Sequence, residues 1–411
     1  MKKRFPTFAG RYKDIASAAR LPSLNWPVLA SMLILLVIGV FFVRSANAIR
    51  TDSVRYQYML VIKWWIPLGL IVHFAVASID YRKWTDYAWV FYLFAMAALV
   101  AVLFIGVEKL GAKRWLFGLQ PSEFAKFAVV LMIVFFLARS TLTNDYGRLF
   151  SALAVAALPT VLVAVQPDLG TAFVLIPTVI TIVFVAGCAR RTLMVLCMAG
   201  ILATGVLISL PILPEKIPEH SREKVEKIVN RIVFPHWKKR IEVFVYPDRD
   251  PLGAGWNKHQ SEIAVGSGGM WGKGYLNGTQ NILGFLPRAV SSTDFIYSVI
   301  AEETGFAGSL FLITLYGVLL AGICVTGFLC RDYTGQLICV GVAVQLFTHV
   351  FVNLAMTIGK MPITGIPLPL ISYGGSFTIS TMALLGLVQS VAIYGNKSTN
   401  GKIETQFKKG K

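Results

Sequence analysis

Asp294 is the acidic residue whose position most clearly suggests a chemical role. It stands where a long polar stretch ends and an apolar run begins, directly before Phe295 and Ile296. A carboxylate at the edge of an apolar segment is costly unless it is paired or used, so a functional role is one interpretation. The other is structural, because Thr293–Asp294 before a helical run is also a helix N-cap pattern. Position alone favours neither interpretation.

A second candidate group combines basic residues with one acid. Glu123 and Lys126 are three residues apart and would share one face of a helix. For Glu123 a structural ion pair is the favoured interpretation, whereas for Lys126 structural and chemical roles are both open. The two roles coexist if Glu123 orients Lys126. Arg114 is a further cationic candidate and Lys113 a weaker one.

The remaining candidates lie at the ends of predicted helices. Asp168 lies between two apolar runs, and capping of the next helix is favoured over a role in shaping an outer cavity. Ser372 and Tyr373, followed by two glycines, open the last apolar run. That junction either lines a cavity or forms a tight turn at a close helix crossing. Glu302 and Glu303 are explained by favourable placement near a helix start, with a position facing the site as the alternative.

The histidines and cysteines indicate no metal site. The five histidines have no metal-ligand spacing, and the five cysteines show neither a zinc pattern nor a disulfide framework. We therefore predict no metal ligands among them.

The composition is that of a membrane protein. Of 411 residues, 55% are hydrophobic and 15% are charged, compared with about half and about a quarter in soluble domains. Apolar runs approach the roughly 20 residues that span a bilayer. The sequence therefore predicts an all-α polytopic membrane protein with about ten transmembrane helices. The apolar runs cover residues 28–43, 64–79, 87–107, 127–138, 149–165, 171–186, 193–210, 308–329, 337–358 and 379–394.

The formal net charge of +18 is concentrated at the chain ends, since eleven basic residues lie in the two tails. Basic tails beside terminal spans are typical of cytoplasmic anchors, and two cytoplasmic termini require an even number of spans. This distribution argues against nucleic-acid binding. Ala46–Asn47–Ala48 resembles a signal-peptide cleavage site, but a retained first helix is favoured because many further spans follow.

One polar stretch interrupts the series of spans. The predicted division is a cytoplasmic tail (1–26), seven spans (27–210), a large extracytoplasmic loop (211–292), three spans (293–395) and a cytoplasmic tail (396–411). Within the loop, apolar residues at helical spacing over 225–233 predict an amphipathic helix. That helix either lies on the membrane surface or packs on the loop's own core. A glycine cluster over 253–274 indicates sharp turns or a close backbone approach, and it matches no phosphate-binding fingerprint.

Several motifs, in order along the chain, resemble the SEDS family (shape, elongation, division and sporulation). Two motifs, Asn277–Gln280 and Thr364–Pro369, are more similar to the RodA branch than to the FtsW branch. Three departures from the family pattern, Arg288, Ser292 and Thr304, lie near Asp294 and leave it intact. The motifs are Gly111–Trp115, Gln120–Glu123 with Lys126, Gln166–Ala172, Gln260–Gly269, Gly272–Gln280, Phe285–Pro287, Thr293–Ile296, Glu302–Gly308 and Pro362–Gly375.

This resemblance implies an activity: polymerisation of lipid II, an undecaprenyl-pyrophosphate-linked disaccharide pentapeptide, in the bacterial plasma membrane. In that reaction the GlcNAc 4-hydroxyl of the acceptor attacks the anomeric carbon of the donor's MurNAc, and the lipid pyrophosphate leaves. Asp294 is then the candidate general base. Arg114 and Lys126 are candidates to stabilise the pyrophosphate. Glu123, Asp168, Ser372 and Tyr373 complete the predicted substrate-binding set.

The resemblance also implies partners, namely a class B penicillin-binding protein that crosslinks the glycan and other membrane proteins of an elongation complex. A divalent cation at the pyrophosphate is compatible with this chemistry, but no residue pattern specifies one. Two other functions suit a polytopic protein with intramembrane charge: a flippase for lipid-linked precursors and a non-catalytic scaffold. The candidate residues gather at predicted outer helix ends, which favours the enzyme over the flippase.

Overall fold

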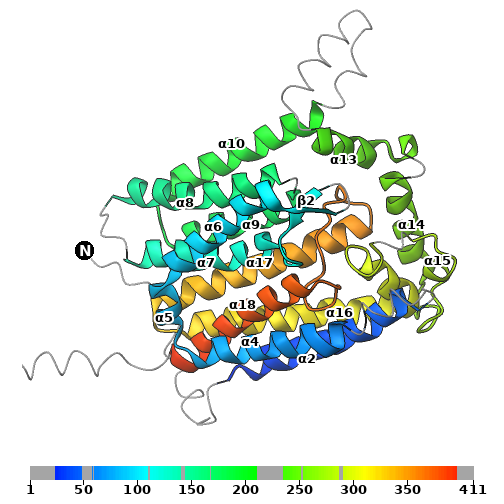
Figure 1. Cartoon of the computed structure of the whole chain (residues 1–411), viewed down its shortest axis with the longest axis horizontal. Coiled ribbons are helices and arrows are strands. Elements are labelled where there is room, and N and C mark those ends of the chain that lie inside the picture. The colour runs from blue at the N-terminus through cyan, green and yellow to red at the C-terminus, as the bar shows by residue number, and fades with distance from the viewer. Residues whose placement is uncertain are drawn as a thin grey trace, which may run out of the picture.

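The protein folds into a bundle of long helices with a group of short helices at one end (Figure 1). Both tails, the expected amphipathic helix over 225–233 and Arg288 lie outside the described residues. The computed structural model describes residues 24–48, 58, 60–109, 112–139, 144–166, 168–210, 235–250, 253–286 and 290–395.

Seven longer helices, the six-residue helix α5 and two short strands form the first part of the described chain. They are α2 (Trp26–Ala46), α4 (Ile66–Ser78, preceded by the π-helix η2, Val61–Trp65), α5 (Tyr81–Asp86), α6 (Ala88–Ile105), β1 (Val107–Lys109), β2 (Ala112–Trp115), α7 (Pro121–Arg139), α8 (Asp145–Val165), α9 (Leu169–Val185) and α10 (Arg190–Ser209). The second part contains α13 (Pro235–Val245), the 3-10 helix η3 (Pro247–Arg249), α14 (Ala254–Ser267), α15 (Thr279–Ile282), α16 (Ile296–Leu329), α17 (Tyr333–Thr357) and α18 (Gly375–Tyr394).

The protein is a polytopic all-α membrane protein, as the composition predicts. Seven helices of the described chain are long and apolar enough to cross a membrane, and two shorter apolar segments accompany them. The count of ten spans stays a prediction. Val28, Met32 and Leu35 of α2 are fully buried, so this first apolar helix is an integral part of the bundle.

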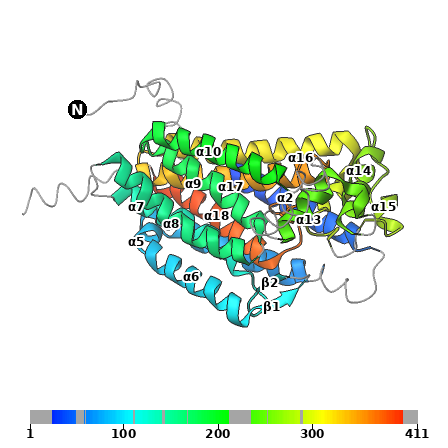
Figure 2. The same ribbon diagram turned by 90° about the horizontal axis from the view of Figure 1, so that it is seen from above.

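The buried core lies between helices that are neighbours in the chain and helices that are distant in sequence. The helix pairs α4–α18, α16–α17 and α9–α17 pack side by side along the bundle, and α6 packs on α7. Figure 2 shows β1 and β2, which form an antiparallel hairpin, beyond the end of α6. Figure 1 places α13, α14 and α15 at the same end of the bundle, away from α5.

Helix α16 is divided by a sharp bend at Gly305, whose φ of 66° and ψ of −160° are not helical. The Ser372 hydroxyl donates to the carbonyl of Thr293, and the Tyr316 hydroxyl donates to the carbonyl of Pro369. Both residues are therefore hydrogen-bonded to one short segment and lie at a similar height along the bundle axis. A straight helix would separate them by roughly 30 Å. The first arm (296–304) thus runs away from segment 368–372, and the second arm (306–329) returns past it.

The glycine cluster is explained by close packing on this bend. A Cβ on Gly268 or Gly272 would lie 2.1 Å from the carbonyl oxygen of Ala301 or of Glu303, respectively. The amide N–H groups of Phe306 and Ala307, freed by the bend, donate to the carbonyls of residues 269 and 270. The expected close backbone approach is therefore made to the protein itself.

Glu302 and Glu303 lie at the end of the first arm, where they tie it to its surroundings. The fully buried carboxylate of Glu302 accepts hydrogen bonds from Lys273 Nζ at 2.6 Å and from Thr279 Oγ1 at 2.9 Å. Glu303 accepts one from the Ser45 hydroxyl at the end of α2. The explanation by placement near a helix start is wrong, because the bend puts both residues at a helix end.

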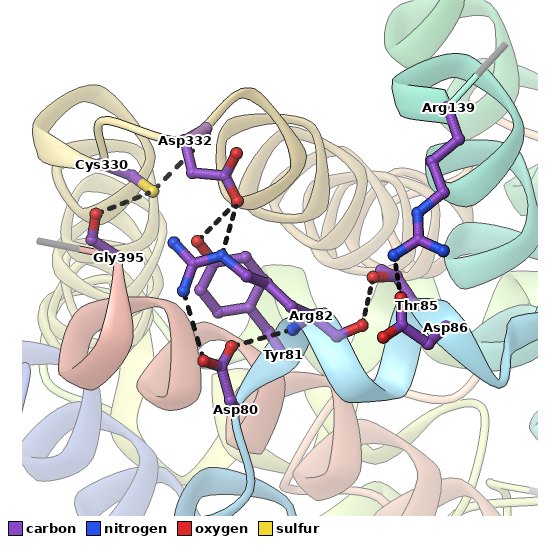
Figure 3. Close-up of polar contacts among 9 residues, drawn as sticks. All are labelled: Asp80, Tyr81, Arg82, Thr85, Asp86, Arg139, Cys330, Asp332 and Gly395. Atoms are coloured by element: carbon purple, nitrogen blue, oxygen red, sulfur yellow. Dashed lines mark hydrogen bonds and ion pairs between the residues drawn. The ribbon is translucent and has the colours of Figure 1, made fainter. Parts of the chain in front are cut away.

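A second polar cluster lies at the opposite end of the bundle (Figure 3). Arg82 bridges Asp80 at 3.2 Å and Asp332 at 3.3 Å, and the buried Tyr81 hydroxyl donates to Asp332 at 2.8 Å. We call these four residues the α5 cluster. Because Asp332 precedes α17, the cluster ties α5 to the loop between α16 and α17.

Candidate functional site

A cavity of about 550 Å³ opens at the end of the bundle that carries α13 and the hairpin. Its walls come from the hairpin, the starts of α7, α9 and α18, helices α13 and α17, and the segment before α16. The charged groups that line it include Arg114, Asp168, Arg240 and Asp294. Four segments separated by long stretches of sequence therefore bring two basic and two acidic residues to one space.

Asp294 is held by its backbone and covered by segment 362–371. Asn353 Nδ2 donates to the carbonyl of Asp294 at 2.9 Å and to that of Ile366 at 2.7 Å. A Cβ on Gly365, where φ is +72°, would lie 3.4 Å from Asp294 Oδ2. The N-cap of α16 is Phe295, and no side chain caps it. The capping interpretation of Asp294 is therefore wrong, and its carboxylate remains turned to the cavity.

The surroundings of Asp294 favour its neutral form. Burial raises the pKa of this carboxyl to about 6, while the positive charges of Arg240 and Arg114 and a hydrogen bond from Thr293 oppose the rise. Burial and the neighbouring Arg114 also lower the pKa of Arg240, against the attraction of Asp168 and Asp294. A carboxylate with a pKa near 6 is ionised at neutral pH and is a stronger base than an ordinary aspartate.

Asp168 fills both roles that the sequence left open. Its Oδ1 accepts a hydrogen bond from the amide of Thr171 at 3.3 Å and so caps α9. Its Oδ2 accepts from Ser122 Oγ at 2.9 Å and from Gln120 Nε2 at 3.0 Å. The guanidinium of Arg114 lies 3.8 Å from Oδ1. Asp168 thus joins α7, α9 and the hairpin at the cavity wall.

Glu123 and Lys126 form the ion pair expected from their spacing, with 2.7 Å between Oε2 and Nζ. Lys126 Nζ also lies 3.0 Å from His349 Nε2 and 5.0 Å from the centre of the Phe377 ring. Glu123, His349 and Phe377 line the cavity, whereas Lys126 is only 1% exposed. Lys126 therefore acts on the cavity through these neighbours rather than from its surface.

Ser372 and Tyr373 join the last loop to the segment that carries Asp294. The Ser372 hydroxyl donates to the carbonyl of Thr293 at 2.6 Å and accepts from the amide of Leu368 at 2.7 Å. The amide of Tyr373 donates to the carbonyl of Ser292 at 2.8 Å, and Tyr373 lines the cavity. The turn interpretation suits Ser372, while Tyr373 meets the cavity expectation.

The sequence missed two charged or titratable residues that the fold brings to the cavity. Arg240 reaches it from α13 and donates through Nη1 to the carbonyls of Ile363 at 3.0 Å and Thr364 at 2.8 Å. Nothing distinguishes Arg240 from the other basic residues of its loop. His349 had a usable signal, because a histidine inside an apolar span is a functional candidate by default.

Lys113 is exposed on the hairpin and is not among the residues that line the cavity. Within the described ranges, no group of three His, Cys, Asp or Glu side chains is arranged to hold a metal ion. A cation bound chiefly by a substrate pyrophosphate would not require such a group.

Comparison with known proteins relates the chain to cell-wall polymerases. A family model described as cell cycle protein, named for FtsW, RodA and SpoVE, matches residues 26–397. The peptidoglycan glycosyltransferase MrdB of Escherichia coli K12 is 37% identical over 330 residues, covering 79% of this chain and 83% of that protein. The peptidoglycan glycosyltransferase RodA of Treponema pallidum is 31% identical, with coverages of 89% and 97%. A solved peptidoglycan synthase complex that coordinates polymerization and crosslinking contains a chain with a TM-score of 0.71 at 29% identity, covering 91% of this chain and 99% of that one.

Proposed function

Because the chain belongs to the SEDS family, is similar to RodA and MrdB proteins, and is a peptidoglycan glycosyltransferase, we propose that Asp294 is its general base. The substrate in this proposal is lipid II, and the product is a glycan strand for cell elongation. The observation that supports it most directly is the convergence of Asp294, Arg240, Arg114 and Asp168 on one cavity.

The reaction needs a base at the acceptor and positive charge at the leaving group. Asp294 accepts the proton of the GlcNAc 4-hydroxyl as that oxygen attacks the anomeric carbon of the donor's MurNAc. The bond from that carbon to the lipid pyrophosphate breaks, and the electron pair leaves with the pyrophosphate. The raised pKa of Asp294 supports this role, since the group is a stronger base than usual yet remains ionised at pH 7.

Arg114 and Arg240 are assigned to the pyrophosphate. A guanidinium matches phosphate oxygens with parallel N–H donors, and charge that develops on those oxygens is stabilised most where water is scarce. Asp168 holds the hairpin arginine, and the carbonyls of segment 363–364 hold Arg240. Glu123 and His349 form the adjacent polar wall, and the buried Lys126 behind them holds both in place.

The orientation proposed places the cavity on the outer face of the bacterial plasma membrane and both termini in the cytoplasm. Asn25 and Gln389 exchange hydrogen bonds of 2.8 and 2.9 Å, so the described chain begins and ends at one end of the bundle. The cavity lies near Gly375, fourteen positions before Gln389, or roughly 20 Å along α18. Basic tails favour the cytoplasmic side for the end away from the cavity.

The partner proposed is a class B penicillin-binding protein that crosslinks the new glycan within an elongation complex. The similarity to a chain of a peptidoglycan synthase complex supports it. This assignment concerns the partner's class only.

The test is polymerisation of purified lipid II by the protein with its transpeptidase partner, whose own active site is blocked. Wild type and Asp294→Ala are compared at equal folded concentration, with glycan length resolved on gels. We expect strands from the wild type and none from the variant. Equal polymerisation by both would refute Asp294 as the base. Lack of wild-type activity where a related polymerase works would favour a flippase or a scaffold.

A further inference from the structure

Trp65 lines the same cavity, and none of the roles above uses it. It is the last residue of the π-helix η2 and stands at the start of α4. Its indole ring lies against the backbone at the start of α18, where a Cβ on Gly375 would come within 2.5 Å of ring carbons Cδ2 and Cε2. Gly375 thus provides the space that lets a large aromatic ring form part of the wall.

The indole N–H of Trp65 has no hydrogen-bond acceptor. The Nε1 atom is buried, and across the described residues no oxygen or nitrogen lies in position to pair with it. A tryptophan N–H that is buried normally finds a partner, because an unpaired buried donor is costly. Trp65 lines the cavity, so a substrate that displaces the ring slightly would bring this N–H to an acceptor and supply the missing partner.

The π-helix gives this placement a local cause. The amide of Ile66 donates to the carbonyl of Val61, five residues back, which widens the turn. Single π turns of this kind occur frequently at functional sites. Here the widened turn separates two neighbouring tryptophans: Trp64 is 64% exposed on the outside, and Trp65 faces inward.

The chemistry of the indole fits a sugar better than the pyrophosphate. An indole has one N–H donor and no charge, whereas the two guanidinium groups of the cavity match an anion. A pyranose offers neutral hydroxyl and acetamide oxygens together with an apolar C–H face, which suit the N–H and the ring.

We propose that Trp65 is a sugar-binding residue, whose indole N–H donates to an oxygen of the lipid-linked disaccharide. This inference rests on the proposed function, because it takes the disaccharide of lipid II as the occupant. It adds a binding contact that Asp294 and the arginines do not provide.

The test measures lipid II binding directly, by a fluorescence titration of the full-length protein in detergent. Trp65→Phe keeps an aromatic ring and removes the N–H, and the exposed neighbour Trp64→Phe is the matched control. We expect Trp65→Phe to weaken binding by about 2- to 10-fold, the effect of one hydrogen bond, and Trp64→Phe to bind like wild type. Thermal stability of both variants is measured without substrate, and affinities are compared at equal folded concentration, because the smaller ring of Trp65→Phe loses part of the packing against Gly375.

Equal affinity of wild type and Trp65→Phe would overturn the inference, as would an equal loss in both variants. Polymerisation by the wild type is measured in parallel. If wild type polymerises but Trp65→Phe binds normally, only the sugar contact is refuted. If wild type binds lipid II through Trp65 but does not polymerise it where a related polymerase does, the contact stands and the proposed polymerisation fails.

Discussion

The two ends of the helix bundle each carry a concentration of charged side chains, yet they differ in how those charges are satisfied. In the α5 cluster, Asp332 receives both the Tyr81 hydroxyl and the Arg82 guanidinium. The charged groups of this cluster are therefore paired with one another (Figure 3). At the other end, Asp294 and the arginines face a cavity, and the strongest influence on the Asp294 pKa is burial rather than a paired cation.

On the proposed function, this difference separates the structural charges of the α5 cluster from the catalytic charge of Asp294. Nearby positive charge and hydrogen bonds favour the ionised form of a carboxylate. A fully paired carboxylate therefore stabilises the folded protein and has a lowered pKa, which makes it a weaker base. A carboxylate kept beside a cavity costs stability and gains basicity. Charged residues alone therefore do not mark a site in a membrane protein, whereas charged residues left facing a space do.

Of the variants that test this comparison, Asp294→Asn is expected to have the largest effect on the polymerisation rate. Loss of a general base typically reduces the rate by roughly 10²–10⁴-fold. The variant should nevertheless be at least as thermostable as wild type at pH 7.5, because a buried charge is removed. Polymerisation rates and melting curves on the same preparation check both parts. A marked drop in melting temperature would show that Asp294 is a structural group instead.

A somewhat smaller effect is expected from Arg240→Gln. Removal of one donor to the developing charge should lower the rate roughly 10²-fold. Arg240→Lys should restore only part of it, since an ammonium lacks the planar fork. Lys239→Gln is the matched control, because Lys239 is the preceding residue and its side chain is 71% exposed. Steady-state polymerisation assays distinguish the three, and equal rates in all of them would remove Arg240 from the site.

The pH profile should show a loss of activity on the acid side. Since the active form of Asp294 is the carboxylate and its pKa is about 6, the rate should fall about tenfold per pH unit below that value and level off above pH 7. The effect of pH on stability has the opposite sign.

Because the pKa of Asp294 is higher in the folded protein than its ordinary value near 4, protonated Asp294 stabilises the fold fully below pH 4. This contribution is lost as the pH rises through 6.

Asp294→Asn should therefore gain stability over wild type when the pH is raised from 4 to 7. Melting temperatures of both proteins across this range, alongside wild-type initial rates, test the two signs together. A wild-type rate that is flat down to pH 4.5 would contradict the raised pKa.

The smallest effect is expected at the α5 cluster. Tyr81→Phe removes one buried hydrogen bond and should lower the free energy of unfolding by about 1 kcal/mol. Loss of the Arg82 ion pairs should cost no more, because these partly exposed pairs are screened by solvent. The polymerisation rate per folded molecule should not change. A fall in rate at unchanged folded fraction would show that this end also takes part in function.

Sequence patterns predicted the membrane fold and much of the cavity, but not how its parts meet. Apolar runs are sufficient to identify spans, since the requirement to satisfy the backbone in lipid leaves few alternatives. Motifs drew attention to Arg114, Asp168 and Asp294, and all three line the cavity, while their roles toward substrate stay predictions. Arg240 was not predictable, because its approach depends on how a long polar loop returns to the bundle.

The bend at Gly305 shows a second limit. The motif around it predicts only a helix near the membrane, because one glycine in a helical pattern is usually tolerated. The bend is stabilised by the loop over 268–274, because carbonyls of that loop accept hydrogen bonds from the backbone N–H groups that the bend frees. This loop is too far away in sequence to be paired with Gly305 from the motif alone. The role of Trp65 was hidden for a similar reason, since neither Trp64 nor Trp65 shows in sequence which of them faces inward.

The size of the cavity has a consequence for how the enzyme makes long strands. A volume of about 550 Å³ falls within the range that encloses one ligand of drug size, which is too small for two lipid-linked disaccharides with their peptides. Most of the growing strand must therefore remain outside while only its reacting end is enclosed. Each cycle then ends with a product that occupies the catalytic space, and the strand has to advance by one disaccharide before the next addition.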